Sequence, residues 1–285
     1  MSIENRWQHG GENIAEKREP VIEHIAVFRV RHGDTEYREH LKGEMQDDLT
    51  ELGKVQIRAS ADAILARIDP ARDIAWVISS PRIRTLDSRK IIEDQLRASG
   101  VEIWDGTRTT ALGGKHDTTF ERIRNFDFLT DGSEGKLEVV ATSESRYPEI
   151  FKKVVADLES EGGVPASQQA HLSKHPQLEK SEDRVRRTRD QLTYLMRIAR
   201  QIQPTLSKRI VIIQTEHTES IDDLIEHATR GVRTEKKMAG VLKGGVVEVH
   251  FPTNPQNNSL EVLFHDTGEE YTVGYDPDKR SFIQE

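Results

Sequence analysis

The chain has 285 residues, of which 35% are hydrophobic and 32% are charged, and its formal net charge is −8 at pH 7. This length can bury a full core, while the polar composition predicts sizeable solvated segments beside it. The acidic balance argues against a nucleic-acid-binding surface. The absence of cysteine excludes disulfides, a thiol nucleophile and a cysteine-based zinc site, and it is typical of a reducing compartment.

Residues 1–23 are polar and contain no run that resembles a signal peptide, and no stretch approaches the length of a membrane span. We therefore expect a cytoplasmic protein without membrane contacts. Its organisation is predicted as a polar N-terminal extension (residues 1–23) followed by one domain over residues 24–285. The sequence does not predict an oligomeric state.

The first half of the domain alternates predicted strands and helices. Short apolar runs at residues 25–30, 74–78 and 101–104 predict buried strands. Helices are predicted from Thr50, as N-cap, to residue 68, and from residue 82 to 96. One face of the first helix is expected to be buried, with Leu52, Val55, Ala59, Ala63, Ile64 and Ile68 on it. This order of elements is typical of a parallel sheet with right-handed crossovers.

The second half is less regular. A polar block at about 105–180, with a short helix predicted at 150–158, is interpreted as an insertion over the sheet. A long amphipathic helix is predicted from residue 182 to Pro204, followed by a strand at 210–213 and a helix at 221–228. Three short strands are predicted at 246–251, 260–264 and 271–275. We expect a three-layer α/β/α fold with a mostly parallel sheet, an insertion after the third strand and an antiparallel C-terminal edge.

Polar residues follow three of the predicted strands. They are Arg31-His32-Gly33, Ser79-Ser80-Pro81 with Arg84, and Glu216-His217. Ligands of open α/β sheets bind beyond the carboxyl ends of strands, where helix N-termini also favour anions. Two arginines and two histidines that converge there would bind a phosphoryl group, and a neutral imidazole is a nucleophile. His32 should stay neutral because nearby guanidinium charge lowers the pKa of a histidine.

These motifs resemble those of the histidine phosphatase superfamily, the phosphoglycerate mutase-like fold. Arg31-His32-Gly33-Asp34-Thr35 resembles the first motif, in which Glu usually stands where this chain has Asp34. Leu49 to Gly53 with Gln56 resembles the second motif, and Ser79-Ser80-Pro81 with Arg84 resembles the third. His217 follows a predicted strand, as the second histidine of the family does. The resemblance covers about residues 25–105 and, in outline, residues 180–250.

The resemblance implies a phosphatase that needs no metal or cofactor and hydrolyses a small phosphate ester or anhydride. His32 would take up the phosphoryl group, and Arg31, Arg84 and His217 would bind its oxygens. Gly33, Thr35 and Arg38 are expected to contact phosphate or substrate. Two alternatives stay open: phosphoglycerate mutase-type transfer back to a bound product, and a phospho-ligand-binding or scaffold protein with little turnover.

The sequence departs from the family at the proton donor. Residues 109–114 contain no acidic residue, although family enzymes usually present a carboxylic acid in this region. Asp117 and Glu121 are the nearest candidates downstream, and Glu216 or Glu219, beside the second histidine, could act instead. Without a general acid, esters with poor leaving groups would react roughly 10²–10⁴-fold more slowly. The identity of the substrate is not predicted.

Overall fold

The computed structural model describes residues 22–35, 48–79, 83–104, 108–109, 115–116, 181–232 and 241–283. Most of the N-terminal extension and of the predicted insertion lies outside the described residues, and so does the helix predicted at 150–158. Two short strands of that insertion are described, β4 (Arg108–Thr109) and β5 (Lys115–His116), and they pair with each other antiparallel. No helix of the described part is long and apolar enough to cross a membrane.

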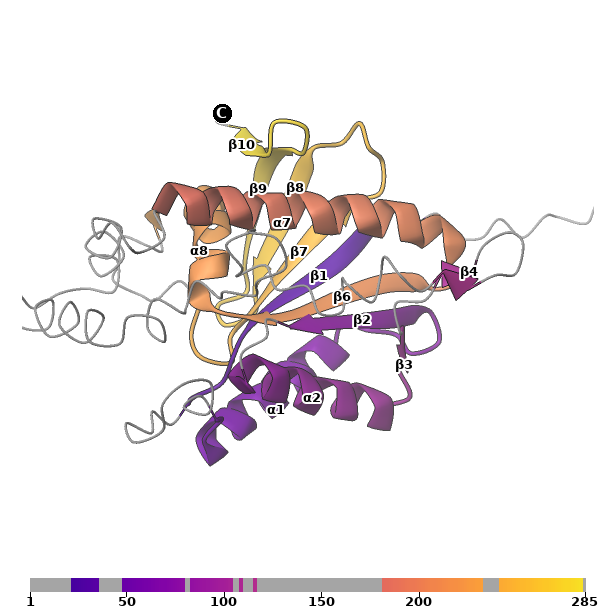
Figure 1. Cartoon of the computed structure of the whole chain (residues 1–285), viewed down its shortest axis with the longest axis vertical. Coiled ribbons are helices and arrows are strands. Elements are labelled where there is room, and N and C mark those ends of the chain that lie inside the picture. The colour runs from indigo at the N-terminus through magenta and orange to yellow at the C-terminus, as the bar shows by residue number, and fades with distance from the viewer. Residues whose placement is uncertain are drawn as a thin grey trace, which may run out of the picture.

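One eight-stranded sheet organises the fold, in the order β10-β9-β8-β7-β1-β6-β2-β3 (Figure 1). Its strands are β1 (His24–Arg31), β2 (Asp73–Ser79), β3 (Glu102–Ile103), β6 (Arg209–Glu216), β7 (Val246–Pro252), β8 (Ser259–Phe264), β9 (Glu269–Asp276) and β10 (Ser281–Ile283). Strands β3, β2, β6 and β1 pair in parallel, whereas β1 pairs antiparallel with β7, and every pair beyond β7 is antiparallel. The sheet is mixed, and the expectation of a mostly parallel sheet was wrong.

The error has a physical reason. The strand–helix alternation of the first half predicts parallel strands, and β1, β2 and β3 are parallel, with β6 inserted between β1 and β2. The C-terminal strands were predicted as an antiparallel edge, and that edge is confirmed, but it makes up half of the sheet because β7 pairs directly with the central strand β1. The three-residue strand β10 was not predicted, since so short a segment carries almost no periodicity.

Two pairs of helices cover the sheet from opposite sides (Figure 1). On one face lie α1 (Glu51–Leu65) and α2 (Ile83–Ala98), and on the other lie α7 (Ser181–Ile202) and α8 (Thr218–Ala228). A short 3₁₀ helix, η2 (Gln203–Thr205), contains Pro204 and follows α7, which ends where the sequence predicted. Both helices were predicted, and they bury Leu192, Leu195, Met196, Ile221, Leu224 and Ile225 in the core.

Successive side chains of β1 point to opposite faces of the sheet and so belong to two separate parts of the core. Phe28 points to the side of α1 and α2, where it packs in one cluster with Ile57 and Ile92. Val27 points to the opposite side and packs in a second cluster with residues of α7 and α8 such as Leu192. A strand buried on both faces reads as a continuous apolar run, which is why the sequence predicted β1 correctly.

The buried face of α1 agrees with the prediction at Ile64 and Ile68 and differs from it in the first turns of the helix. Thr50 is the N-cap, as expected, and its hydroxyl accepts a hydrogen bond from the Gly53 amide at 2.9 Å. However, Leu52 and Val55 are 58% and 57% exposed, and the buried residues of the helix are Gly53, Ile57, Ser60, Ala61 and Ile64. The helix is rotated because Gly53 packs directly against the loop that follows β1, a contact that helical periodicity alone does not predict.

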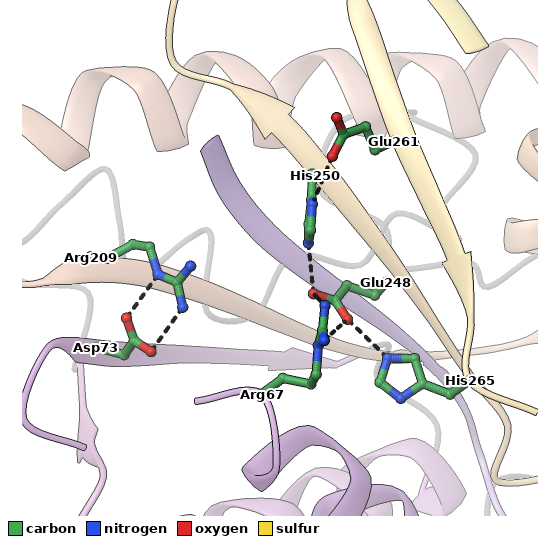
Figure 2. Close-up of polar contacts among 7 residues, drawn as sticks. All are labelled: Arg67, Asp73, Arg209, Glu248, His250, Glu261 and His265. Atoms are coloured by element: carbon green, nitrogen blue, oxygen red, sulfur yellow. Dashed lines mark hydrogen bonds and ion pairs between the residues drawn. The ribbon is translucent and has the colours of Figure 1, made fainter. Parts of the chain in front are cut away.

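A polar cluster around a buried carboxylate joins the end of α1 to the antiparallel half of the sheet (Figure 2). Its centre is the Glu248 carboxylate on β7, which lies 2.6 Å from Nε2 of His250 and 3.0 Å from Nε2 of His265. Arg67, just beyond α1, donates to the same carboxylate at 3.1 Å. In the parallel half, Figure 2 shows a second, partly buried contact, in which Arg209 of β6 binds both oxygens of Asp73 on β2.

Candidate active site

The residues predicted to bind phosphate follow three neighbouring strands. His32 comes directly after β1, His217 directly after β6, and Arg84 lies in the first turn of α2, after β2. Because β1, β6 and β2 are parallel neighbours, their carboxyl ends meet at the same edge of the sheet. The backbone amide of His32 donates to the carbonyl oxygen of Glu216 at 3.0 Å, so the first histidine is held beside the second.

The two histidine rings lie close to each other. Their centroids are 5.1 Å apart, with an angle of 64° between the ring planes. Both rings are buried, with His32 7% exposed and His217 3% exposed. The structure therefore brings together His32, His217 and Arg84, three residues that stand far apart in the sequence.

The His32 imidazole is held neutral with a defined proton position. Burial is the largest influence on it, and with the charges of Arg84, Arg31 and Lys243 it lowers the pKa of His32 to about 3, against a weaker opposing effect of the Gly33 backbone. Nδ1 lies 2.7 Å from the carbonyl oxygen of Gly33, which can only accept a hydrogen bond. The ring proton therefore sits on Nδ1, and Nε2 keeps the lone pair that a nucleophile needs.

Arg84 determines the proton position on the second histidine. Its Nε and Nη2 atoms lie 3.4 and 3.3 Å from Nδ1 of His217, and Arg84 is 6% exposed. A guanidinium has only donors, so Nδ1 of His217 accepts and the proton of the neutral ring sits on Nε2. Nε2–H is thus a hydrogen-bond donor. His217 is also the N-cap residue of α8, where the helix dipole favours negative charge.

Arg31 contacts the segment that precedes β7. Its Nη1 donates to the carbonyl oxygen of Val241 at 2.7 Å, and its backbone amide donates to Gly245 at 3.1 Å. Its positive charge is one of those that lower the pKa of His32. Arg31 therefore contributes to the electrostatics of the site and at the same time ties β1 to the segment before β7.

Gly33 and Gly53 pack backbone to backbone. A Cβ atom on Gly33 would lie 2.4 Å from the carbonyl oxygen of Gly53, and a Cβ on Gly53 would lie 2.1 Å from that of Asp34. The contact is reinforced by Gln56, whose side-chain oxygen accepts from the Asp34 amide at 2.8 Å. The glycine after His32 is therefore required by close packing against α1, and the second sequence motif is the surface that it packs against.

The remaining predicted contacts are described only in part. Thr35 is 7% exposed and forms a β-bridge with Leu49, and its hydroxyl has no hydrogen-bond partner among the described residues. Arg38, Asp117 and Glu121 lie outside the described residues. Glu219 lies in the first turn of α8, but its side chain is not among those described.

The fourth candidate, Glu216, has its carboxylate bound by an arginine. Arg29 donates to it from Nε at 2.6 Å and from Nη2 at 2.7 Å, and the Gln214 amide adds a bond of 3.1 Å. Burial raises the pKa of this carboxyl, against the opposing effect of Arg29. As a proton donor, Glu216 would have to release Arg29 first.

Two charged residues of the site were missed by sequence reasoning. Arg29 interrupts the apolar run of β1, and an unexplained charge in a buried strand is a signal for a buried partner. Lys243, which forms an ion pair with Asp34, gave no such signal, because a lysine next to Gly244 and Gly245 reads as an ordinary turn before a strand. In the described part of the chain, no group of three or more acidic or histidine side chains is arranged to hold a metal ion.

The family comparison agrees with the geometry. Residues 27–159 match the family model of the histidine phosphatase superfamily (branch 1). The matched segment contains the loop after β1, helix α1 and Arg84, and it ends before β6 and His217. The resemblance seen in the first three motifs is confirmed, and the match supports phosphatase or mutase-like activity.

Several solved structures are similar to the chain at low identity. A mycobacterial glucosyl-3-phosphoglycerate phosphatase is 14% identical over 80% of this chain and 90% of its own, with a TM-score of 0.38. A phosphoserine phosphatase from Entamoeba histolytica, in complex with 3-phosphoglyceric acid, is 17% identical over 92% and 98%, with a TM-score of 0.38. A phosphoglycerate mutase from Bacillus anthracis is 13% identical over 90% and 96%, with a TM-score of 0.44. No curated protein matches the chain.

Proposed function

We propose that this protein is a metal-independent phosphatase that hydrolyses a phosphate ester or anhydride through a phosphohistidine at His32. The observation that carries the proposal is the state of the His32 ring. It is neutral, with its proton on Nδ1 and its Nε2 lone pair free, and it lies beside Arg84 and a donor on His217. Binding a phosphate anion does not require a nucleophile in this state, whereas attack on phosphorus does.

The reaction has two steps. Nε2 of His32 attacks phosphorus, the bond from phosphorus to the leaving oxygen breaks, and that oxygen takes a proton from a carboxylic acid. Water then attacks the phosphohistidine, the phosphorus–nitrogen bond breaks, and the proton of the water returns to the carboxylate. Arg31, Arg84 and Nε2–H of His217 would stabilise the charge on the equatorial oxygens in both steps. The Thr35 hydroxyl, Gly33 and Arg38 are further proposed contacts.

Four acidic residues are candidates for the proton donor: Glu216, Glu219, Asp117 and Glu121. Of the four candidates, Glu216 fits least well, because its carboxylate is buried in an ion pair with Arg29. We therefore favour Glu219, Asp117 or Glu121 as the donor. Phosphoanhydrides and aryl phosphates need less help from an acid, because their leaving groups are weaker bases.

One observation favours a second function, binding of a phospho-ligand with little turnover. The two described carboxylates in the residues that adjoin the histidines are both in ion pairs, Asp34 with Lys243 and Glu216 with Arg29. A site without any free acid would retain an anion but would release poor leaving groups slowly. Turnover of an ester with a good leaving group, compared with that of an alkyl phosphate, separates the two functions.

The test uses p-nitrophenyl phosphate, a set of alkyl phosphates and three proteins. Wild type should turn over the aryl ester, and His32→Ala should lose at least about 10³-fold in kcat, as expected when a nucleophile is removed. His24→Ala is the matched control, because His24 lies at the opposite end of the same strand. Turnover that survives in His32→Ala would exclude the phosphohistidine. Binding without turnover in wild type would favour the second function.

A further inference from the structure

Lys243 reaches across from the segment before β7 to the loop that carries His32. Its Nζ forms an ion pair with the Asp34 carboxylate. The two side chains are 37% and 28% exposed, so the pair is at the surface and yet close to the buried histidine. Asp34 stands one residue beyond Gly33, so Lys243 holds the loop at its outer end.

The backbone next to Lys243 holds the same loop at its inner end. The Gly244 amide donates to the carbonyl oxygens of both Arg31 and His32, each at 3.1 Å, and the Gly245 carbonyl accepts from the Arg31 amide. The Gly244 carbonyl in turn accepts from the Ser60 hydroxyl of α1. A Cβ on Gly244 would meet Gln56 at 2.8 Å, so these backbones approach each other closely. Residues 243–245 thus connect the end of β1 to helix α1 through hydrogen bonds and close packing.

Asp34 contacts both Lys243 and two residues of the α1 region, Thr50 and Gln56. Its carboxylate accepts from the Thr50 hydroxyl at 3.0 Å, its amide donates to Gln56, and its carbonyl accepts from the Thr50 amide at 3.0 Å. The hydrogen bond from Lys243 is the largest reason that the pKa of Asp34 is lowered, so the carboxylate remains charged near neutral pH. Lys243 is also close enough for its charge to act on the His32 ring.

We propose that Lys243 is a positioning residue of the catalytic loop, which binds the Asp34 carboxylate and thereby fixes the His32 backbone between β7 and α1. This inference rests on the proposed function, since it assigns the lysine to that site. Loss of the ion pair would free the outer end of the loop, while Arg84 and His217 would keep their places. Partly exposed ion pairs add little to the stability of a fold. The effect should therefore appear in catalysis and local dynamics, with only a small change in the global unfolding transition.

Four variants test the inference. Lys243→Met removes the charge at similar length, Lys243→Arg keeps it, and Asp34→Asn removes the acceptor charge. Lys54→Met is the matched control, because Lys54 is also a lysine in an ion pair, is 39% exposed, and binds Glu51, which lies outside the loop. Two quantities are measured: kcat and KM for p-nitrophenyl phosphate, and the hydrogen-exchange rate of the Asp34 amide.

We expect Lys243→Met to lower kcat about 10–100-fold with a smaller change in KM, because misplacement of a reacting group acts mainly on the chemical step. The Asp34 amide should exchange about three- to tenfold faster, in keeping with the loss of one partly exposed ion pair. Asp34→Asn should give the same result, Lys243→Arg should restore most of kcat, and Lys54→Met should behave as wild type.

The results separate this inference from the proposed function. If wild type turns over substrate in a His32-dependent way, a kcat for Lys243→Met within about twofold of wild type would overturn the inference alone. If wild type does not turn over any phosphate ester, the proposed function fails, and the exchange rate still decides whether Lys243 positions the loop. An Asp34 amide that exchanges equally in wild type and Lys243→Met would show that it does not.

Discussion

Arg29 and Glu216 form a buried bidentate ion pair that joins the two strands carrying the histidines of the candidate site. The nitrogen–oxygen distances are 2.6 and 2.7 Å, and both residues are 1% exposed. Arg29 stands three residues before His32 on β1, and Glu216 stands one residue before His217 on β6. The pair therefore couples the positions of the His32 and His217 rings. It lies on the face of the sheet covered by α7, where Gln191 also contacts Arg29.

Arg29→Met should destabilise the protein by about 3–5 kcal/mol, because it leaves a buried carboxylate without its counter-charge. The double variant Arg29→Met, Glu216→Met should be much closer to wild type, since both charges are then absent. Urea unfolding of Arg29→Met, Glu216→Met and the double variant measures the coupling energy between the two side chains. Additive losses in the double variant would contradict the account given for the pair.

The neutral state of His32 predicts that acid destabilises the protein. The pKa of His32 is lowered from 6.5 to about 3 in the folded protein, so below about pH 6.5 the unfolded chain binds a proton that the folded protein does not. Stability is then lost as the pH falls, by about 2 kcal/mol between neutral pH and about pH 5. His32→Asn should lose less stability than wild type over this range in urea unfolding. An equal loss would show that His32 is not held neutral.

The polar cluster around Glu248 (Figure 2) has the opposite effect on stability to that of His32: its contribution is lost as the pH rises. Burial lowers the pKa of His250, but bonds to Glu248 and Glu261 outweigh it and the pKa is raised overall. Protonated His250 therefore stabilises the fold below about pH 6.5, and this stabilisation is lost as the pH rises through the raised value. Burial raises the pKa of Glu248, but the bonds from His250 and His265 outweigh it, so this carboxylate stays charged throughout that range.

The measurement is the thermal midpoint of wild type and His250→Gln between about pH 6 and pH 8. The stability of wild type relative to His250→Gln should fall as the pH rises across this range, because both proteins keep the contribution of His32 and only wild type has that of His250. His250→Gln should therefore be less stable than wild type at the lower end. The neighbouring groups that face His250 are His24, Glu248 and Glu261, and all three remain in the variant. Parallel curves for the two proteins would contradict the prediction.

Gly33→Ala should lower both stability and turnover. The new Cβ would lie 2.4 Å from the Gly53 carbonyl oxygen, so the loop or α1 must move, at a cost of about 1–3 kcal/mol. Gly100→Ala is the control, because its Cβ would meet nothing within 4 Å and only its φ of +79° is unfavourable. We expect both variants to be less stable in urea unfolding, while only Gly33→Ala lowers kcat. Full activity in Gly33→Ala would show that the close packing does not position His32.

The parts of the fold that were predicted are those with a local signal. Buried strands such as β1, β2 and β6 are continuous apolar runs, and the polar residues directly after them mark the strand ends at which His32 and His217 lie. The buried face of α1 was mispredicted because a tertiary contact between Gly33 and Gly53 sets the rotation of the helix. Helical periodicity in the sequence carries no information about that contact.

The missed parts of the site depend on residues that are distant in sequence. Arg29 and Glu216 are 187 positions apart, and Asp34 and Lys243 are 209 apart. Such pairs become visible only once the order of strands is known, and the mixed sheet places β6 and β7 on either side of β1. A single sequence gives the residue types of the candidate site, whereas the strand order shows which of them meet.

The central position of β1 has a consequence for how the protein is made. Its two neighbours in the described sheet, β6 and β7, both lie in the last third of the chain, and each pairs with it over nearly its full length. During synthesis, the strand that precedes His32 therefore leaves the ribosome long before either of its partners exists. Contacts of such long range form slowly and leave an apolar strand unpaired in the meantime. A nascent chain of this protein should depend on chaperones until β7 has emerged, and a chain that ends before β6 should not hold His32 in place.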